Sequence, residues 1–343
     1  MSSNTKRFGV GIRGAGQVAY EHADAIEKNP HLFLKAVCSR SSDSAHKLAA
    51  RYGNEATVYE TYEEMLSDKA VDIVSICMPN YLHAREAVLA FKAKKHLILE
   101  KPAAVTYEEL QELRQAAKKA ETRSVVSFVL RWHPMVNNLK PLLDHNAIGD
   151  IYYAEADYWH GIQKTFSSYN WIRKKEFAGG AMITGGCHAA DILRFLTGKQ
   201  ADEVFAYRCR IRPDFDYDTT LVASVKFKDG SVGKLSASID GLCFPYQFNI
   251  DLLGTEGAIR DNRIYSKKLF PEQNDFVTIP TSTPDSGSVG HHPFQQEIDN
   301  LTDGILNGTP IRSDVLDACD SMEIVLAIET SAATGKPVKV TGM

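Results

Sequence analysis

The sequence predicts an α/β protein in two domains: a doubly wound parallel sheet, then an α+β domain on an open, mostly antiparallel sheet. Over the first 130 or so residues short β-branched runs alternate with helical patterns, and after Arg131 the strands follow one another directly. A glycine-rich turn also separates the first strand from the first helix. Because 343 residues can form two cores, we place the domains at 1–130 and 131–343.

The first domain is expected to contain buried strands joined by helices. The segments between the strands, such as "LHAREAVLAFKAKK", carry apolar residues at helical spacing. Alternation of strand and helix implies right-handed crossovers, and therefore a parallel sheet. The expected strands are residues 8–12, 34–39, 72–78, 96–100 and 124–130.

The second domain is expected to consist mainly of consecutive strands. Asp229 and Gly230 in "FKDGS" predict a hairpin turn, because both residue types tolerate positive φ. Residues 280–293 are rich in Pro, Gly and Ser and predict a loop, after which two helices close the chain. The expected strands are residues 151–160, 203–211, 220–227, 232–240 and 247–254.

Composition and charge narrow the classes of function. With 39 basic and 43 acidic residues the net charge is −4, which gives no general attraction to nucleic acid or to an anionic membrane. No apolar run approaches the roughly 20 residues of a bilayer span. The start of the sequence lacks the apolar stretch of a secretory signal, so we expect a cytoplasmic protein. Its six cysteines include no CxxC pair, which favours reduced thiols over disulfides or a zinc site.

The turn after the first strand has the pattern of a dinucleotide site. Gly14, Gly16 and Ala19 form G-x-G-x-x-A between a strand and a helix. Glycines there permit a tight turn and close approach of a pyrophosphate, and the helix N-terminus supplies N–H groups. A glycine-rich turn without a ligand is the alternative, which the strand–turn–helix context disfavours. The expected cofactor contacts are Gly14, Ala15, Gly16, Gln17 and Val18.

The end of the second expected strand bears on the choice of cofactor. Ser39 and Arg40 stand there, and no acidic residue does. An acid would bind the ribose 2′-hydroxyl of NAD, whereas an arginine would accept the 2′-phosphate of NADP. We therefore expect NADP, with NAD as the alternative because Arg40 could equally be a solvated surface charge.

The stretch "GGAMITGGCHAAD", residues 179–191, admits three interpretations: a thiol nucleophile with its base, a metal site, or a buried helix start. The following pattern predicts a helix that ends at Gly198, with His188 on its first turn. Asp191 stands three residues later and thus shares a helical face with the histidine. A carboxylate beside an imidazole can fix its tautomer and raise its basicity.

Several motifs together resemble one family. They are the glycine motif, "MPNYLHAREAV", "EKP", "RWHP", "GGAMITGGCHAAD" and "HPFQQEIDNL". In order and spacing they are similar to the glucose–fructose oxidoreductase / inositol dehydrogenase (Gfo/Idh/MocA) family of NAD(P)-dependent sugar and polyol oxidoreductases. The resemblance implies a Rossmann domain, then an α/β domain whose exposed sheet face commonly joins subunits, here as a homodimer or homotetramer. It also implies cofactor contacts at Pro79, Asn80, His83, Glu100 and Lys101.

The resemblance further implies two catalytic residues. Lys101 follows a parallel strand, where its ammonium can donate to a substrate oxygen, and the family uses this lysine in catalysis or substrate orientation. His188 would take the proton of the sugar hydroxyl, and Asp191 would support it or the substrate. A helix-capping role for His188 is the alternative. Cys187 need not be a nucleophile, and the reaction needs no metal.

The sugar pocket departs from the inositol type at one position. Inositol dehydrogenases usually carry an aspartate four residues before the histidine, whereas this chain has Thr184, which disfavours inositol itself. The expected substrate contacts are Arg131, Trp132, Tyr158, His160, Trp171, Thr184 and Asp191.

The leading functional hypothesis is a dehydrogenase that interconverts a secondary hydroxyl and a ketone of a sugar or polyol. One alternative is a redox-neutral glycosidase or epimerase in which a bound cofactor is transiently reduced. Another is a non-catalytic nucleotide-sensing regulator, which would need neither Lys101 nor His188.

Overall fold

The computed structural model describes residues 6–52, 56–240, 246–284 and 292–341. The chain divides into two compact units, and we describe each separately. The first unit comprises Met1–Val129 and Pro293–Cys319, and the second comprises Leu130–His292 and Asp320–Met343. The first division lies beside the expected boundary, but residues 293–319 return to the first unit, which no local pattern in the sequence indicated.

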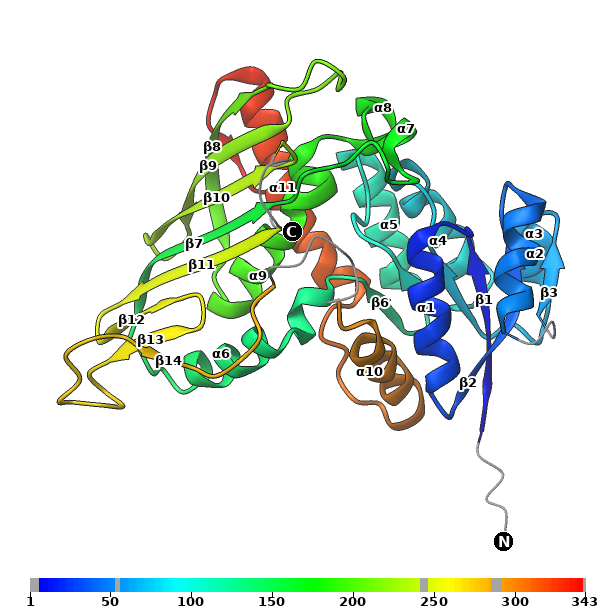
Figure 1. Cartoon of the computed structure of the whole chain (residues 1–343), viewed down its shortest axis with the longest axis horizontal. Helices are drawn as coiled ribbons and strands as arrows, with labels where there is room; N and C mark the ends of the chain where they lie inside the picture. Colours follow the sequence, from blue (N-terminus) through cyan, green and yellow to red (C-terminus); the bar gives the residue numbers. More distant parts are fainter. Residues whose placement is uncertain (1–5, 53–55, 241–245, 285–291, 342–343) are drawn as a thin grey trace, which may run out of the picture. The chain divides into compact units, whose positions relative to one another are not determined.

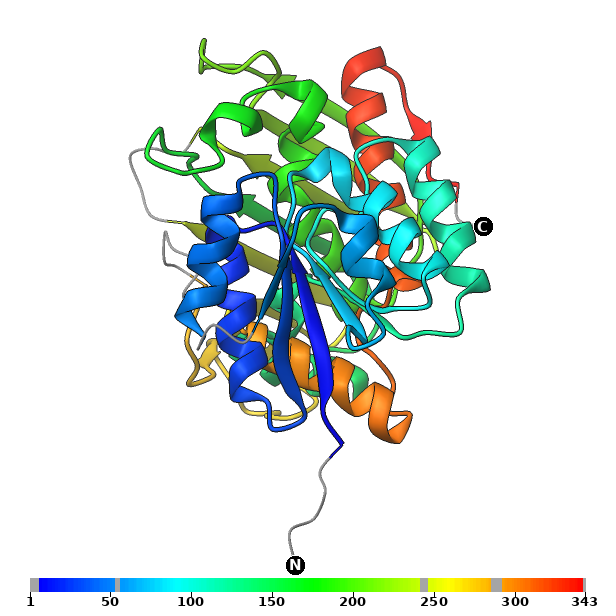
Figure 2. The same ribbon diagram turned by 90° about the vertical axis from the view of Figure 1, so that its right-hand side faces the viewer.

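The first unit contains a parallel sheet with the strand order β3-β2-β1-β4-β5-β6 (Figure 2). The order reverses between β1 and β4, so this sheet is doubly wound as predicted. The short strand β3 was not expected, because its three residues lack a buried apolar run. The strands are β1 (Phe8–Arg13), β2 (Leu32–Cys38), β3 (Thr57–Tyr59), β4 (Ile73–Ile76), β5 (His96–Leu99) and β6 (Ser124–Val126).

Helices connect these strands, and one further helix joins them from far along the chain. Thr106 caps α5 in a capping box with Glu109, which satisfies amide groups that the helix start leaves open. Helix α10 lies beside α1 (Figure 1), where Asn29 donates to Asp299 at 2.7 Å. The helices are α1 (Gln17–Lys28), α2 (Ser42–Arg51), α3 (Tyr62–Ser67), α4 (His83–Lys92), α5 (Tyr107–Lys119) and α10 (Phe294–Asn307).

The second unit contains a mixed, mostly antiparallel sheet with the order β14-β13-β12-β11-β7-β10-β9-β8-β15. Strands β7 and β10 are parallel neighbours, and the other paired strands run antiparallel. The predicted hairpin joins β9 to β10, with Gly230 at φ 89°. The strands are β7 (Ile151–Trp159), β8 (Ala201–Cys209), β9 (Thr220–Phe227), β10 (Val232–Ser238), β11 (Gln247–Gly254), β12 (Gly257–Arg260), β13 (Arg263–Ser266), β14 (Val277–Thr278) and β15 (Val338–Lys339).

Helices line one face of this second sheet. Figure 1 shows α6, α9 and α11 along that face, and in β9 the residues Leu221, Ala223 and Val225 are buried. The alternate residues of β9 point to the opposite, outer face. The helices are α6 (Pro134–Asp144), α7 (Tyr169–Ile172), α8 (Lys175–Ala178), α9 (Cys187–Thr197) and α11 (Val315–Thr334), the last of which belongs to this unit from Asp320 onward.

Two expectations fall partly outside the described residues. The predicted loop at 280–293 is described only in part, and Cys243 is among the residues not described. The described cysteines Cys38, Cys77, Cys187, Cys209 and Cys319 form no disulfide. Where the structure describes a helix, that helix is too short or too polar to cross a bilayer.

Candidate active site

The predicted cofactor residues gather at one edge of the first unit. They lie at or just beyond the carboxyl ends of β1, β2, β4 and β5, the edge at which open parallel sheets bind ligands. The switch point between β1 and β4 is at this edge, beside the glycine turn. The residues at these ends are Gly14, Ala15, Gly16, Gln17, Val18, Ser39, Arg40, Pro79, Asn80, His83, Glu100 and Lys101.

The geometry of the glycine turn fits a pyrophosphate. Gly14 has φ 98°, and a Cβ there would lie 2.4 Å from the carbonyl oxygen of Cys77, so only glycine fits. At Gly16 an added Cβ would meet no atom within 4 Å, so this residue faces open space. Gly16 is also the N-cap of α1 and contributes no side-chain cap, which leaves the first amide groups available to a phosphate.

The turn between β2 and α2 presents Arg40 to solvent. Ser39 is half-buried, and Ser41 caps α2 by accepting the N–H of Ser44 at 3.3 Å. The nearby guanidinium of Arg13 is held by both carboxylate oxygens of Glu86, each at 2.9 Å. Arg13 is therefore engaged within the protein, and Arg40 remains the predicted contact of a 2′-phosphate.

His83 is buried at the same edge and contacts two backbone carbonyl groups there. Its ring nitrogens lie 2.7 Å from the carbonyl oxygen of Pro102 and 2.6 Å from that of Met78. The side chain is buried, so it connects the segments that follow β4 and β5. Lys101 sits in the second of these segments and is half-buried, next to the buried Glu100.

In the second unit, a π-helical turn leads directly into α9. This turn covers Met182–Gly186, and π-helical turns are frequent at functional sites. A Cβ at Gly185 would lie 2.8 Å from the ring of Tyr158, so the glycine allows the turn to pack against that ring. The Thr184 hydroxyl donates to the carbonyl oxygen of Ala178 at 3.0 Å.

A buried carboxyl group holds the start of this turn. Glu329 of α11 accepts the N–H of Met182 at 3.1 Å, and burial raises the pKa of Glu329 to about 7. A Cβ at Gly180 would lie 2.3 Å from the same carboxyl group, so this glycine makes room for Glu329. The stretch "GGAMITGGCHAAD" therefore contains glycines that let the backbone pack closely against neighbouring side chains, and a backbone N–H that is held by a buried carboxyl group.

His188 lies at the centre of an aromatic cluster. It is fully buried on the first turn of α9, and its ring stacks on Tyr158 with centroids 5.3 Å apart. The Tyr158 hydroxyl lies 3.5 Å from Nδ1 of His160. Tyr246 packs edge-on against Tyr158 at 5.1 Å, and His292 lies 6.1 Å from the His188 ring.

The structure therefore brings together three predicted residues, Tyr158, His160 and His188, and adds two that sequence reasoning missed. Tyr246 and His292 come from strand-flanking and loop segments, where a single sequence gives them no periodic pattern. One signal could have pointed to His292. It belongs to "HHP", at the start of a motif that resembles the family.

Asp191, expected to support His188 or the substrate, also makes contacts that the sequence did not predict. Both its oxygens bind the guanidinium of Arg131, at 2.5 and 2.8 Å, and one also accepts the hydroxyl of Ser321 at 2.8 Å. The side chains of Arg131 and Asp191 are 2% and 1% exposed. A buried guanidinium requires a paired charge, and this requirement decides the partner of Asp191. Through these buried contacts Asp191 connects α9 to the segment before α6 and to α11.

The two predicted tryptophans lie in different surroundings. Trp132 is 5% exposed and belongs to the core next to Arg131. Trp171 is half-buried on the short helix α7. No ring contact between either tryptophan and His188 is found within the described residues.

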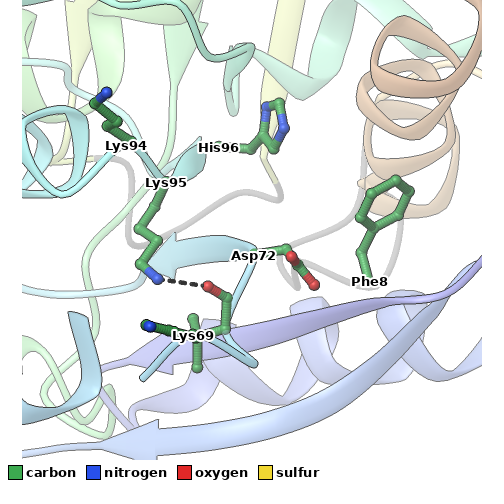
Figure 3. Close-up of a pocket in the computed structure, with 7 residues that line it drawn as sticks. Phe8, Lys69, Asp72, Lys94, Lys95 and His96 are labelled. Atoms are coloured by element: carbon green, nitrogen blue, oxygen red, sulfur yellow. Dashed lines mark hydrogen bonds between the residues drawn. The ribbon is translucent and has the colours of Figure 1, made fainter. Parts of the chain in front are cut away.

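A cavity of about 300 Å³ lies at the other edge of the first sheet (Figure 3). Phe8, Asp72 and His96 mark the amino ends of β1, β4 and β5 there, opposite the cofactor edge. Lys95 donates to the carbonyl oxygens of Asp68 and Val71, at 2.8 and 2.7 Å. Lys95 thus links the segment before β4 to the start of β5, and the cavity lies at the sheet edge opposite the predicted cofactor residues. In the described parts of the chain, no cluster of three or more His, Cys, Asp or Glu side chains could hold a metal ion.

Comparison with known proteins supports this description of the two units. Residues 8–128 match the oxidoreductase family with an NAD-binding Rossmann fold, and residues 136–260 match the GFO/IDH/MocA C-terminal domain. The chain belongs to the Gfo/Idh/MocA family. Membership confirms the resemblance seen in the sequence, and with it an NAD(P)-dependent oxidoreductase. The redox-neutral and regulatory alternatives are not favoured.

Relatives within the family include dehydrogenases of sugars and polyols. The chain is 27% identical to scyllo-inositol 2-dehydrogenase (NAD(+)) of Bacillus subtilis, over 96% of this chain and 95% of that protein. It is also 27% identical to levoglucosan dehydrogenase of Pseudarthrobacter phenanthrenivorans, over 74% and 73%. A solved structure of levoglucosan dehydrogenase with NADH shares the fold, with a TM-score of 0.88 and 24% identity, over 98% of this chain and 100% of that one.

Proposed function

We propose that the chain oxidises a secondary hydroxyl group of an uncharged sugar or polyol, or reduces the matching ketone, with Lys101 and His188 as its catalytic residues. The observation that carries this proposal is His188, buried on the first turn of α9 and stacked on Tyr158. The stacking fixes the plane of the imidazole, and burial excludes water from it. Both are features of a positioned general base.

Each residue has a distinct task in the proposed reaction. The glycine turn at Gly14 and Gly16 would hold a nicotinamide cofactor, which when bound would supply the hydride acceptor for oxidation and the hydride donor for reduction. The ammonium group of Lys101 donates a hydrogen bond to the reacting oxygen, and an imidazole nitrogen of His188 takes the hydroxyl proton. His160 and Tyr158 provide polar and aromatic surface for the sugar.

Thr184 supports a substrate other than inositol. Its hydroxyl carries no charge and donates to Ala178, so it cannot replace the aspartate of the inositol type. The relatives named as dehydrogenases of scyllo-inositol and of levoglucosan support a substrate among the polyols and sugars. We therefore propose a monosaccharide, or its anhydro or glycoside form, as the substrate in place of inositol.

NADP is the proposed cofactor, with NAD as the alternative. Arg40 is exposed at the end of β2 and can pair with a 2′-phosphate, while no carboxylate at the strand end opposes that phosphate. A cytoplasmic location is part of the same proposal, because the described cysteines form no disulfide and a reducing compartment keeps thiols in that state.

The test compares His188→Ala with Cys187→Ala, its neighbour on the same helical turn. A panel of sugars and polyols with each cofactor first identifies a substrate by the appearance or loss of reduced nicotinamide. We expect His188→Ala to lower turnover by about 10²- to 10⁴-fold, with little change in cofactor affinity. Cys187→Ala should stay close to the wild type. Full activity in His188→Ala together with an inactive Cys187→Ala would overturn the assignment.

A further inference from the structure

A buried polar cluster in the first unit lies beneath the turn that carries Lys101. Its members are His22 on α1, Ser75 at the end of β4, Glu100 after β5, and Glu297 on α10. His22 and Glu297 are 0% exposed, and Glu100 is 7% exposed. Ionisable groups are rarely buried unless they have partners, so each contact in this cluster needs a reason.

His22 connects the ends of two neighbouring strands. Its Nδ1 lies 2.9 Å from the hydroxyl oxygen of Ser75, and its Nε2 lies 3.0 Å from Oε1 of Glu100. Helix α1 positions this ring, and the same helix begins at the glycine turn that fits a pyrophosphate. The cofactor cradle and the Glu100 carboxylate are therefore held by one helix.

The charges of the cluster support an ion pair between His22 and Glu100. Burial acts against a charged ring, yet Cys77 and Glu100 raise the pKa of His22 well above its ordinary value. Burial likewise acts against a carboxylate, yet the hydrogen bond and charge of His22 hold the pKa of Glu100 below its ordinary value. A charged imidazole donates from both nitrogens, which suits Ser75 and Glu100 as acceptors.

The second oxygen of Glu100 reaches the lysine turn. Oε2 of Glu100 accepts the backbone N–H of Lys101 at 3.1 Å. On the other side of Lys101, the carbonyl oxygen of Pro102 lies 2.7 Å from the ring of His83. Both sequence neighbours of Lys101 are thus held by buried histidines, His22 acting through Glu100 and His83 acting directly.

Helix α10 closes the cluster from the other side. The Phe294 ring packs on the His22 ring with centroids 4.9 Å apart, and Ser127 donates to Oε1 of Glu297 at 2.8 Å. Burial raises the pKa of Glu297 to about 8, which favours the neutral carboxyl group beside the pair of His22 and Glu100.

We infer that His22 is a positioning residue, which fixes the Glu100 carboxylate and through it the backbone of Lys101. The inference rests on the proposed catalytic role of Lys101. It adds His22 as the residue that holds the backbone of Lys101 in position through Glu100. Glutamine at position 22 would carry no charge and therefore could not form an ion pair with Glu100.

The experiment combines His22→Gln with Lys101→Ala in a double-mutant cycle in the full-length protein. We expect His22→Gln to lower kcat by about 10- to 100-fold, because small displacements of a catalytic group have effects of this size. In the Lys101→Ala background, His22→Gln should have no further effect on kcat, because it acts through the lysine. Multiplicative losses would overturn the inference, since a general structural defect acts independently of Lys101.

A matched control and a second readout separate the possible failures. His96→Gln changes another histidine of the same unit at the opposite sheet edge and should leave kcat unchanged. The Lys101 amide signal in ¹H–¹⁵N spectra should shift in His22→Gln and stay in place in His96→Gln; an unmoved signal would overturn the inference. If the wild type turns over no sugar, the proposed function is wrong, and the amide shift still tests the positioning. If His22→Gln does not fold, Glu100→Gln replaces it with the same expected results.

Discussion

At the scale of the residue, Glu297 and Glu329 are buried carboxyl groups with raised pKa. Ser127 donates to the first at 2.8 Å, and the Met182 N–H donates to the second at 3.1 Å. Burial raises their pKa to about 8 and about 7, because neither carboxylate has enough partners to replace water. Each residue therefore makes folding depend on pH.

Glu297→Gln should remove much of this pH dependence. Between the ordinary value of 4.5 and about 8, the folded protein binds a proton that the unfolded chain has released. The free energy of unfolding therefore falls as the pH rises across this range, and the stabilisation is lost once the pH passes about 8. At pH 9 we expect the variant to be more stable than the wild type by on the order of 2–4 kcal/mol. Urea unfolding at pH 5 and pH 9 measures this difference. The same change in the free energy of unfolding between the two pH values in both proteins would contradict the prediction.

Arg40→Asp should reverse the cofactor preference. The wild type is expected to bind NADPH more tightly than NADH, because a guanidinium can pair with the 2′-phosphate. An aspartate would repel that phosphate and accept the ribose hydroxyl instead. Fluorescence titration with both cofactors measures the two affinities. Wild-type binding that is equal for both, or that favours NADH, would refute the NADP proposal while leaving the family assignment intact.

At the scale of the element, the Arg131–Asp191 pair ties the turn before α6 to helix α9. Ser321 adds α11 to the same contact, with its hydroxyl 2.8 Å from Asp191. The guanidinium also lies over the ring of Phe195, 4.9 Å from its centroid. Charged, hydrogen-bonded and aromatic contacts thus meet at the helix that carries His188.

Asp191→Asn should destabilise the protein by about 3–5 kcal/mol, because it leaves the buried guanidinium of Arg131 without a paired charge. The double variant Arg131→Met/Asp191→Leu should recover most of this loss, because two apolar groups need no charge compensation. Asp320→Asn is the matched control. Its carboxylate accepts from Arg194 at 3.2 Å, likewise between α11 and α9, but these side chains are 44% and 20% exposed, so the loss should be less than about 1 kcal/mol. Chemical denaturation measures all three. A loss in Asp191→Asn no larger than in the control would disprove the buried-charge argument.

At the scale of the whole molecule, the outer face of the second sheet is the surface through which we expect the chain to form an oligomer. Val222 is 45% exposed and Tyr207 is 73% exposed on this face. Together with Phe205, Ser224 and Lys234, they line a hollow of about 220 Å³. Exposed apolar groups around a hollow are typical of a surface that meets another protein.

We expect a symmetric oligomer joined through this face. Light scattering at micromolar concentration should give at least the mass of a dimer. Val222→Glu should yield the monomer, because it would place a charge at the centre of the contact. Ile211→Glu alters a residue that is 76% exposed beyond the end of β8 and should leave the mass unchanged. A monomeric wild type would rule out the prediction.

Short-range patterns in the sequence determined much of this protein. The alternation of strands and helices, the hairpin at Gly230 and the end of α9 at Gly198 depend on residues close to one another in the chain. The dinucleotide turn is equally local, because φ at Gly14 and the helix start at Gly16 are set within one turn. The motifs shared with the family further predicted an NAD(P)-dependent oxidoreductase of sugars or polyols.

Only the tertiary structure decided which side chains meet. Asp191 faces the same helical turn as His188 in the sequence, yet it binds Arg131, because a buried guanidinium must be compensated by whichever carboxylate the fold brings near. The pairing of His22 with Glu100 and the return of α10 to the first unit likewise join segments far apart in the chain. Such contacts leave no periodic trace in one sequence, because they are selected by burial and charge after the elements have packed.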